Sequence, residues 1–284
     1  MQIIIINIFV FLVVNLISVI LYFSGNNPLS LWKNVDAVVN WLAMPYSGRE
    51  LLHKPWTIFT HFFLHTGFSH IFWNLVTLYF FGKLFQEYMQ NKILSVYVLG
   101  ALCGAFLSFT AQHVFRNLKQ FDPASGMLGA SAGIMAVVLA TATLLPDLSI
   151  RILFIGNVTL KYVAIFFVAI DIISLPYYNN SGGHIAHLGG ALFGFLFSWQ
   201  LRKGKDWSKL FNRIFVWLKS LLSGKTRAKM KVAYKRKVSD EDYNYSKVQE
   251  QHKVDQILDK ISRSGYESLS KEEKDFLFSA SNKK

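Results

Sequence analysis

Long stretches without charge limit what this chain can fold into more than any other feature. Of the 284 residues, 52% are hydrophobic and 17% are charged, against roughly 25% charged residues in ordinary soluble domains. Six stretches contain no Lys, Arg, Asp or Glu apart from Asp171 in the fifth: residues 3–23, 55–82, 93–115, 123–146, 162–178 and 184–201. About 20 apolar residues span a bilayer as a helix, and backbone polar groups in hydrocarbon must pair internally. The sequence therefore predicts an all-α membrane protein with six transmembrane helices.

Positive charge is concentrated directly after the sixth stretch. Residues 202–237 contain 13 Lys and Arg but one acidic residue, Asp206, and the formal net charge of the whole chain is +13. A dense basic segment beside a membrane helix indicates the cytoplasmic side, so six helices put both termini in the cytoplasm. Nucleic-acid binding could also explain a basic run, but its place at a helix end already accounts for the charge. We expect no nucleic-acid partner.

The beginning of the chain carries no recognisable targeting signal. Its first apolar stretch lacks a basic segment before it and a small-residue cleavage pattern after it, which favours a retained helix over a removed signal peptide. The single cysteine, Cys103, excludes an internal disulfide, and we interpret it as a small buried residue. From the six-helix size and the lack of targeting signals we expect a bacterial inner-membrane protein.

Polar side chains gather near the beginning of three predicted helices. Polar groups within membrane spans are costly and usually mark function. The second, fourth and sixth helices run from outside to inside, so at about 1.5 Å per residue their polar groups lie at a similar depth in the outer half of the bilayer. These groups are His61, His65, His70, Asn74, Ser131, His184 and His187.

Ser131 and His187 have the surroundings that nucleophilic catalysis needs. A serine nucleophile requires a base within hydrogen-bond reach and donors for the developing oxyanion. Ser131 is flanked by glycine and alanine on both sides, in residues 129–133. These small neighbours leave room for a substrate carbonyl. Gly190 and Gly194 have the G-x-x-x-G spacing of closely packed helices, and His187 lies three residues before Gly190. Close packing of these helices would bring His187 to Ser131.

His70 and Asn74 are four residues apart and therefore share one face of the second helix. Both side chains could donate hydrogen bonds to an oxyanion. Together with the preceding motifs, this element resembles the rhomboid family of intramembrane serine proteases over roughly residues 50–201, with the first helix as a sixth span. The elements that carry the resemblance are Gly129-Ala130-Ser131, His70-Ile-Phe-Trp-Asn74, and Ala186-His187-Leu-Gly-Gly190 with Gly194.

The resemblance implies a rhomboid-type bundle with a Ser131–His187 dyad and no obligatory acid. It also implies an oxyanion site made by His70, Asn74 and the Ser131 N–H, and packing roles for the three glycines named above. Such enzymes cleave transmembrane or juxtamembrane segments of other membrane proteins without cofactor or metal. His184 is then an accessory histidine at the mouth of the site. We expect Asp171 at the water interface rather than as a third member of the catalytic group.

The chain departs from the family pattern at three positions. Ala132 stands where the family usually has a glycine after the serine. Thr57 follows Trp56 where the family has an arginine that braces the first outer loop. Met135 stands where an aromatic residue often packs on the catalytic histidine. The first departure bears most directly on activity, because it adds a methyl group beside the nucleophile.

Three other functions fit parts of the pattern. A membrane di-iron oxygenase would need further ligands, typically adjacent histidine pairs, and the sequence contains none. An intramembrane metalloprotease would need H-E-x-x-H, but Phe62 occupies the glutamate position of His61-x-x-x-His65. The remaining alternative is a rhomboid-like pseudoprotease that binds membrane clients without cleavage. Such proteins typically lack the serine or the histidine, and this chain has both.

The C-terminal part predicts a cytoplasmic helical tail after a membrane domain of residues 1–202. Residues 203–237 combine an amphipathic helix (207–222) that would lie in the membrane interface against anionic lipids with a flexible polybasic linker. A soluble helix docked on protein is the alternative for 207–222. Residues 238–284 predict a small helical hairpin, because apolar residues repeat at helical spacing from Val254 to Ile261 and Ser270 with Glu273 form a capping-box pattern.

Overall fold

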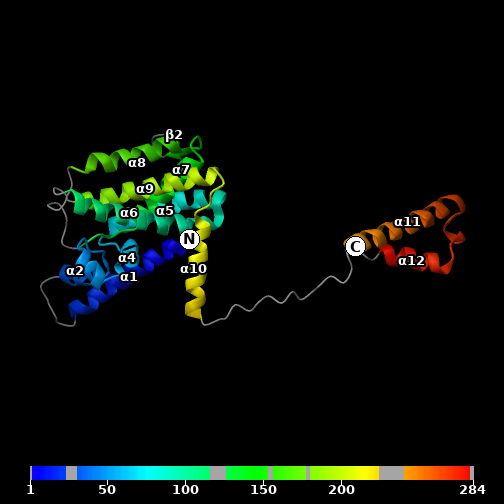
Figure 1. The fold of residues 1–284 in the computed structure, drawn as a ribbon, viewed down its shortest axis with the longest axis horizontal. Helices are drawn as coiled ribbons and strands as arrows, with labels where there is room; N and C mark the ends of the chain where they lie inside the picture. The colour runs from blue at the N-terminus through cyan, green and yellow to red at the C-terminus, as the bar shows by residue number, and fades with distance from the viewer. Residues whose placement is uncertain are drawn as a thin grey trace. The chain divides into compact units, whose positions relative to one another are not determined.

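The computed structural model describes residues 2–23, 31–115, 126–152, 156–176, 180–223 and 240–281. The chain separates into two compact units, Met1–Leu222 and Ser223–Lys284. Helices dominate the first unit (Figure 1). Its long helices are α1 (Gln2–Phe23), α5 (Phe68–Met89), α6 (Ile93–Val114), α7 (Ser131–Leu144), α8 (Leu160–Ser174) and α9 (Ser181–Arg202). Its other helices are α2 (Leu31–Leu42), α3 (Gly48–His53), α4 (Thr57–Thr60), η1 (His61–Phe63), η2 (Gln90–Lys92) and α10 (Ser208–Ser223).

Each of the six charge-poor stretches overlaps one long helix, but the second stretch is not one continuous helix. Residues 57–63 form α4 and η1, and α5 begins only at Phe68. His61 and His65 therefore precede the helix in which the sequence placed them. Among the described helices, α1 and α6 are long and apolar enough to cross a bilayer, and α7 is a shorter apolar helix. The count of six membrane spans stays a prediction.

A small β-hairpin interrupts the expected all-α fold. Strands β1 (Ser149–Ile152) and β2 (Gly156–Thr159) pair antiparallel, from Ser149 opposite Thr159 to Ile152 opposite Gly156. β-branched residues on both strands favour the extended backbone. The hairpin fills the connection between α7 and α8, so it delays the start of α8 to Leu160.

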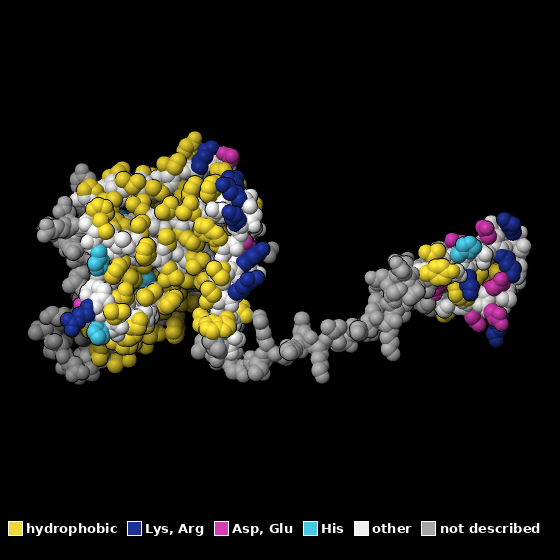
Figure 2. All heavy atoms as spheres, viewed as in Figure 1, with side chains coloured by type: hydrophobic (Ala, Val, Ile, Leu, Met, Phe, Trp, Pro, Cys, Tyr) yellow, Lys and Arg dark blue, Asp and Glu magenta, His cyan; other side chains and the backbone are white. Residues whose placement is uncertain are grey.

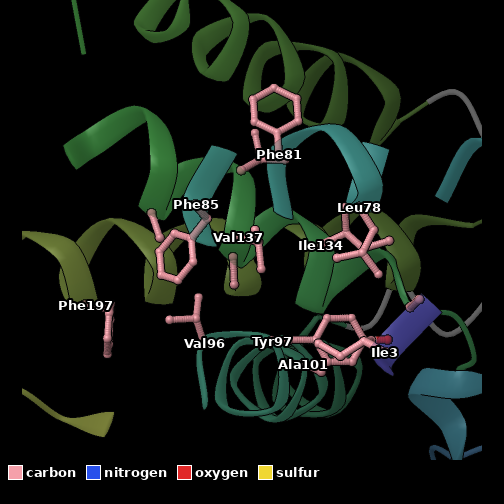
Figure 3. Close-up of a cluster of buried hydrophobic side chains, with 14 of the residues drawn as sticks. Ile3, Leu78, Phe81, Phe85, Val96, Tyr97, Ala101, Ile134, Val137 and Phe197 are labelled. Atoms are coloured by element: carbon pink, nitrogen blue, oxygen red, sulfur yellow. The ribbon is translucent and has the colours of Figure 1, made fainter. Parts of the chain in front are cut away.

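Helix α7 forms the centre of the bundle and contacts α5, α6, α8 and α9. Every residue from 132 to 138 is buried. Figure 3 shows Ile134 and Val137 of α7 among side chains from four other helices: Ile3, Leu78, Phe81, Phe85, Val96, Tyr97, Ala101 and Phe197. The Tyr97 hydroxyl donates a hydrogen bond to the Phe62 carbonyl at 2.8 Å. Dense packing on all sides fixes α7 in position, and Ser131 is its first residue.

The outer surface of the bundle is apolar, as Figure 2 shows for the visible face. On α8, for example, Ile165 and Ile173 are 62% and 65% exposed. A continuous exposed apolar surface of this kind indicates contact with lipid or protein rather than water. Lys and Arg side chains gather along one edge of the bundle, beside α10 (Figures 1 and 2).

Helix α10 confirms the helix predicted over 207–222. Its apolar side chains stay largely exposed, with Leu210 at 65% and Trp217 at 60%. An ion pair of 3.1 Å between Asp206 and Lys92 ties the segment before α10 to the start of α6. Burial raises the pKa of Asp206, but hydrogen bonds from Ser208 and Lys92 outweigh it and hold the pKa below its usual value.

The second unit contains α11 (Asp240–Ser264), η4 (Tyr266–Ser268) and α12 (Lys271–Ser281). Gly265 ends α11 with a φ of +77°, a conformation that glycine adopts at no steric cost. The predicted capping box is confirmed: Glu273 N–H donates to Ser270 Oγ at 3.2 Å, and Ser270 N–H donates to Glu273 Oε2 at 2.7 Å. The polybasic linker falls almost wholly on residues 224–239, outside the described residues.

Candidate active site

Backbone hydrogen bonds hold the turn that leads into Ser131. Met44 and Met127 exchange backbone hydrogen bonds of 2.9 and 2.8 Å, and Gly129 N–H donates to the His61 carbonyl at 2.9 Å. Gly129 has a φ of +122°, which side chains with a Cβ rarely adopt. The turn therefore requires glycine at this position, and it places Ser131, which is partly buried, at the beginning of a buried helix.

Helices α7 and α9 pack with their backbones in contact. A methyl group added to Gly190 would overlap the Ala132 carbonyl, and one added to Gly194 would overlap the Ala136 carbonyl. Further along both helices, Ser198 Oγ–H donates to the Ala140 carbonyl at 2.9 Å. The small-residue spacing of α9 thus faces α7, in the arrangement that the sequence analysis expected.

Ser131 and His187 meet across this interface. Ser131 Oγ–H donates to His187 Nε2 at 2.6 Å, and His187 Nδ1–H donates to Asp171 Oδ1 at 2.9 Å. The three side chains come from α7, α9 and α8 and form a continuous chain of hydrogen bonds. A carboxylate in this position orients the imidazole and selects the tautomer whose Nε2 can accept a proton.

The expectation for Asp171 was wrong. Its side chain is buried, with 5% of the residue exposed, and does not lie at the water interface. His184 Nδ1–H donates to the same Oδ1 at 2.8 Å, so Asp171 accepts hydrogen bonds from two imidazoles. A buried carboxylate is tolerated where such bonds replace its hydration. His184 is accordingly a partner of Asp171 beside the expected base.

His70 and Asn74 both lie beside a histidine that the sequence analysis did not assign to the site. Asn74 Nδ2–H donates to His65 Nε2 at 3.0 Å, and the His65 and His70 rings lie 5.0 Å apart, edge to face. His65 is 2% exposed. His65 thus contacts both expected oxyanion donors. Because it lies nine residues before Asn74, there was no local signal of this contact in the sequence.

Gly129 lies close to both His70 and Ser131. A methyl group built on Gly129 would lie 3.3 Å from His70 Nε2 and 3.5 Å from Ser131 Oγ. A side chain at this position would crowd both groups, and glycine leaves them unobstructed. The Asn74 amide nitrogen carries two hydrogens, and His65 occupies one of them. The arrangement therefore offers hydrogen-bond donors beside the nucleophile.

Two of the three departures from the expected motif have structural counterparts. The methyl group of Ala132 points toward α6, where a Cβ on Gly104 would lie 2.8 Å from it. Gly104 thus makes room for the added methyl. Trp56 donates its indole N–H to the Trp41 carbonyl at 2.9 Å, and the two rings lie 4.9 Å apart. These contacts brace the segment before α4 without an arginine.

Comparisons with known proteins agree with the architecture. A family model described as the Rhomboid domain matches residues 52–204, more than half of the chain. A second model, for a family of unknown function (DUF6576), matches residues 238–283.

Curated relatives include both mitochondrial proteins and one named inactive. RHOMBOID-like protein 12, mitochondrial, of Arabidopsis thaliana is 29% identical over 56% of this chain and 48% of its own length. Presenilin-associated rhomboid-like protein A, mitochondrial, of Danio rerio is 30% identical over 55% and 39%. Inactive rhomboid-related protein 2 of Caenorhabditis elegans is 25% identical over 65% and 53%. The chain spans about half the length of these relatives or less. On the domain match, supported by these relatives, the chain belongs to the rhomboid family of membrane-embedded proteins.

Proposed function

We propose that this chain is an intramembrane serine endopeptidase that cleaves transmembrane or juxtamembrane segments of membrane proteins. The observation that carries the proposal is the hydrogen bond of 2.6 Å from Ser131 Oγ to His187 Nε2. A hydroxyl in contact with an unprotonated imidazole nitrogen is the arrangement that activates a serine nucleophile. The acid on the other side of the ring, Asp171, strengthens this assignment.

The reaction that this geometry supports proceeds in two stages. Ser131 Oγ attacks the scissile carbonyl while its proton passes to His187 Nε2, and Asp171 stabilises the resulting imidazolium. His187 then protonates the leaving amine, and an acyl-enzyme remains on Ser131. A water molecule then transfers a proton to His187 and attacks this ester, and His187 returns the proton to Ser131 Oγ as the acid product leaves. In both stages His70, Asn74 and the Ser131 N–H would donate hydrogen bonds to the oxyanion.

A pseudoprotease that binds membrane clients without cleavage is the second candidate. The name of the C. elegans relative, which includes the word inactive, is the observation that favours it. In this chain, however, Ser131 and His187 are both present and in contact. The protease is therefore the better-supported of the two functions.

We further propose that the site opens toward the outer side of the membrane and that both termini are cytoplasmic. The edge rich in Lys and Arg lies beside α10 (Figure 2), as expected for the cytoplasmic side. The exposed apolar side chains of α10 would lie in the interface with anionic lipids. The mitochondrial names of two relatives do not support the expected bacterial inner membrane.

The decisive experiment measures cleavage of a generic transmembrane substrate in liposomes. Ser131→Ala and His187→Ala should each abolish cleavage, whereas Ser279→Ala and His113→Ala should cleave like the wild type. Ser279 belongs to the second unit, and His113 is an exposed residue at the end of α6. A fluorophosphonate reagent should label the wild type at Ser131. A folded wild type that neither cleaves nor is labelled, yet captures clients as well as Ser131→Ala, would establish the pseudoprotease instead.

Asp171 acts on His187 and is therefore a positioning residue in this proposal. Asp171→Asn keeps the side-chain shape but loses the charge that stabilises the imidazolium. We expect kcat to fall by at least about tenfold with little change in KM, because the contribution arises in the transition state. Asp171→Glu should restore part of the rate. An unchanged kcat in Asp171→Asn would reduce the catalytic group to Ser131 and His187.

A further inference from the structure

Three potential metal ligands converge beside the nucleophile. Asp171 Oδ1 lies 2.8 Å from His184 Nδ1 and 2.9 Å from His187 Nδ1. Among the described residues, these three side chains form a group whose ligand atoms all lie within 4.8 Å of one another. The two histidines are three residues apart on α9, and the aspartate reaches them from α8.

The ligand types and their spacing suit a zinc ion. Two imidazoles and one carboxylate, with a fourth position left for water, are a common zinc site in proteins. Ligand atoms on a tetrahedral ion with bonds of 2.0–2.1 Å are separated by about 3.3 Å. Asp171 Oδ1 would therefore move away from each nitrogen by roughly half an ångström. Magnesium and calcium prefer sites made of oxygen atoms, which this group does not offer.

The group is shielded but can be reached from solvent. The side chains of His184 and His187 are 18% and 23% exposed, and that of Asp171 is 7% exposed. An ion could thus approach over the imidazoles and keep a water molecule as a fourth ligand.

We propose that Asp171, His184 and His187 bind Zn²⁺ and that the bound ion inhibits the protease proposed above, so the regulatory part rests on that function. In the hydrogen-bonded state, His187 carries its proton on Nδ1 and presents a lone pair on Nε2 to Ser131. Coordination through Nδ1 uses the lone pair of that nitrogen, so a neutral ring must carry its proton on Nε2. An Nε2–H group cannot accept the Ser131 proton. The ion is an inhibitor here and has no part in peptide-bond hydrolysis.

The first test measures binding and does not depend on activity. Equilibrium dialysis of the full chain in detergent, purified without a histidine tag, should show one Zn²⁺ per chain. Asp171→Asn and His184→Gln each remove one of three ligands and should weaken binding by at least tenfold. Ser131→Ala and His113→Gln lie outside the ligand set and should bind like the wild type. Zinc affinity that is the same in all four variants would overturn the site.

The second test measures inhibition and separates the two proposals. Added Zn²⁺ should stop cleavage of the transmembrane substrate, and EDTA should restore it. In His184→Gln, the zinc concentration for half inhibition should rise at least tenfold relative to that variant's own zinc-free rate. Zinc that binds at this site but leaves cleavage unchanged would refute inhibition. A wild type that never cleaves would refute the protease function, whereas the dialysis result would still decide the site.

Discussion

The Ser131–His187 contact depends on how closely α9 approaches α7, and Gly190→Ala tests this dependence. The added methyl group would overlap the Ala132 carbonyl, whereas ordinary van der Waals contact begins near 3.4 Å. The two helices must therefore separate by at least about 1 Å at this level. Ser131 directly precedes Ala132, and His187 lies one turn before Gly190. The distance of 2.6 Å between Oγ and Nε2 would thus increase to at least about 3.6 Å, which is too long for a hydrogen bond.

We expect two measurable effects of Gly190→Ala. A displacement of about 1 Å at a catalytic contact can lower the rate by about 100-fold. Overpacking of this kind also lowers the free energy of unfolding by about 1–3 kcal/mol. The assays are cleavage of the transmembrane substrate in liposomes and thermal unfolding in detergent, both at a temperature where the variant remains folded.

Gly48→Ala provides the matched control. Among the described atoms, a methyl group at Gly48 would meet only the Phe109 ring, at 3.9 Å, so both rate and stability should stay close to wild type. A folded Gly190→Ala protein that cleaves at the wild-type rate would refute the reasoning. The close approach of α9 would then not be what holds His187 against Ser131.

Three further predictions concern the scaffold. Tyr97→Phe leaves the buried Phe62 carbonyl without its hydrogen-bond donor. The free energy of unfolding, measured by chemical denaturation, should fall by about 1–3 kcal/mol. An unchanged value would mean that another donor replaces the hydroxyl. Asp206 has a lowered pKa in the folded chain, so its stabilising contribution is complete above the ordinary Asp pKa and is lost as the pH falls through the folded value. Limited proteolysis around α10 should accordingly increase in acid, and Asp206→Asn should remove that pH dependence if the ion pair with Lys92 is its source. Ser270→Ala breaks the capping box and should lower the stability of the second unit by about 1 kcal/mol, measurable as an earlier loss of helical circular dichroism on heating; coincident melting curves would show that α12 does not need the cap.

Local sequence determined where the helices lie and which residues were candidates for chemistry. Stretches without charge indicated the six long helices of the first unit. A membrane helix requires a run of consecutive apolar residues, and such a run can be read directly from the sequence. The small residues around Ser131 and the spacing from His187 to Gly194 indicated one close helix contact, since such spacing selects one face of a helix. The capping box of Ser270 and Glu273 was also readable, because its partners are three residues apart.

The tertiary structure alone decided the remaining partners in the site. Asp171 could face water or the site, and the rotation of α8 about its axis placed it against two histidines of α9. His65 meets Asn74 only because the helix is interrupted between η1 and α5, so that the connecting residues lie against α5. Helix periodicity specifies which residues share a face of one helix. It does not specify which neighbouring helix that face contacts, nor how far the two helices are shifted along their axes. Those relations depend on packing among distant segments, and here they turned an expected pair of catalytic residues into a chain of three with a second histidine attached.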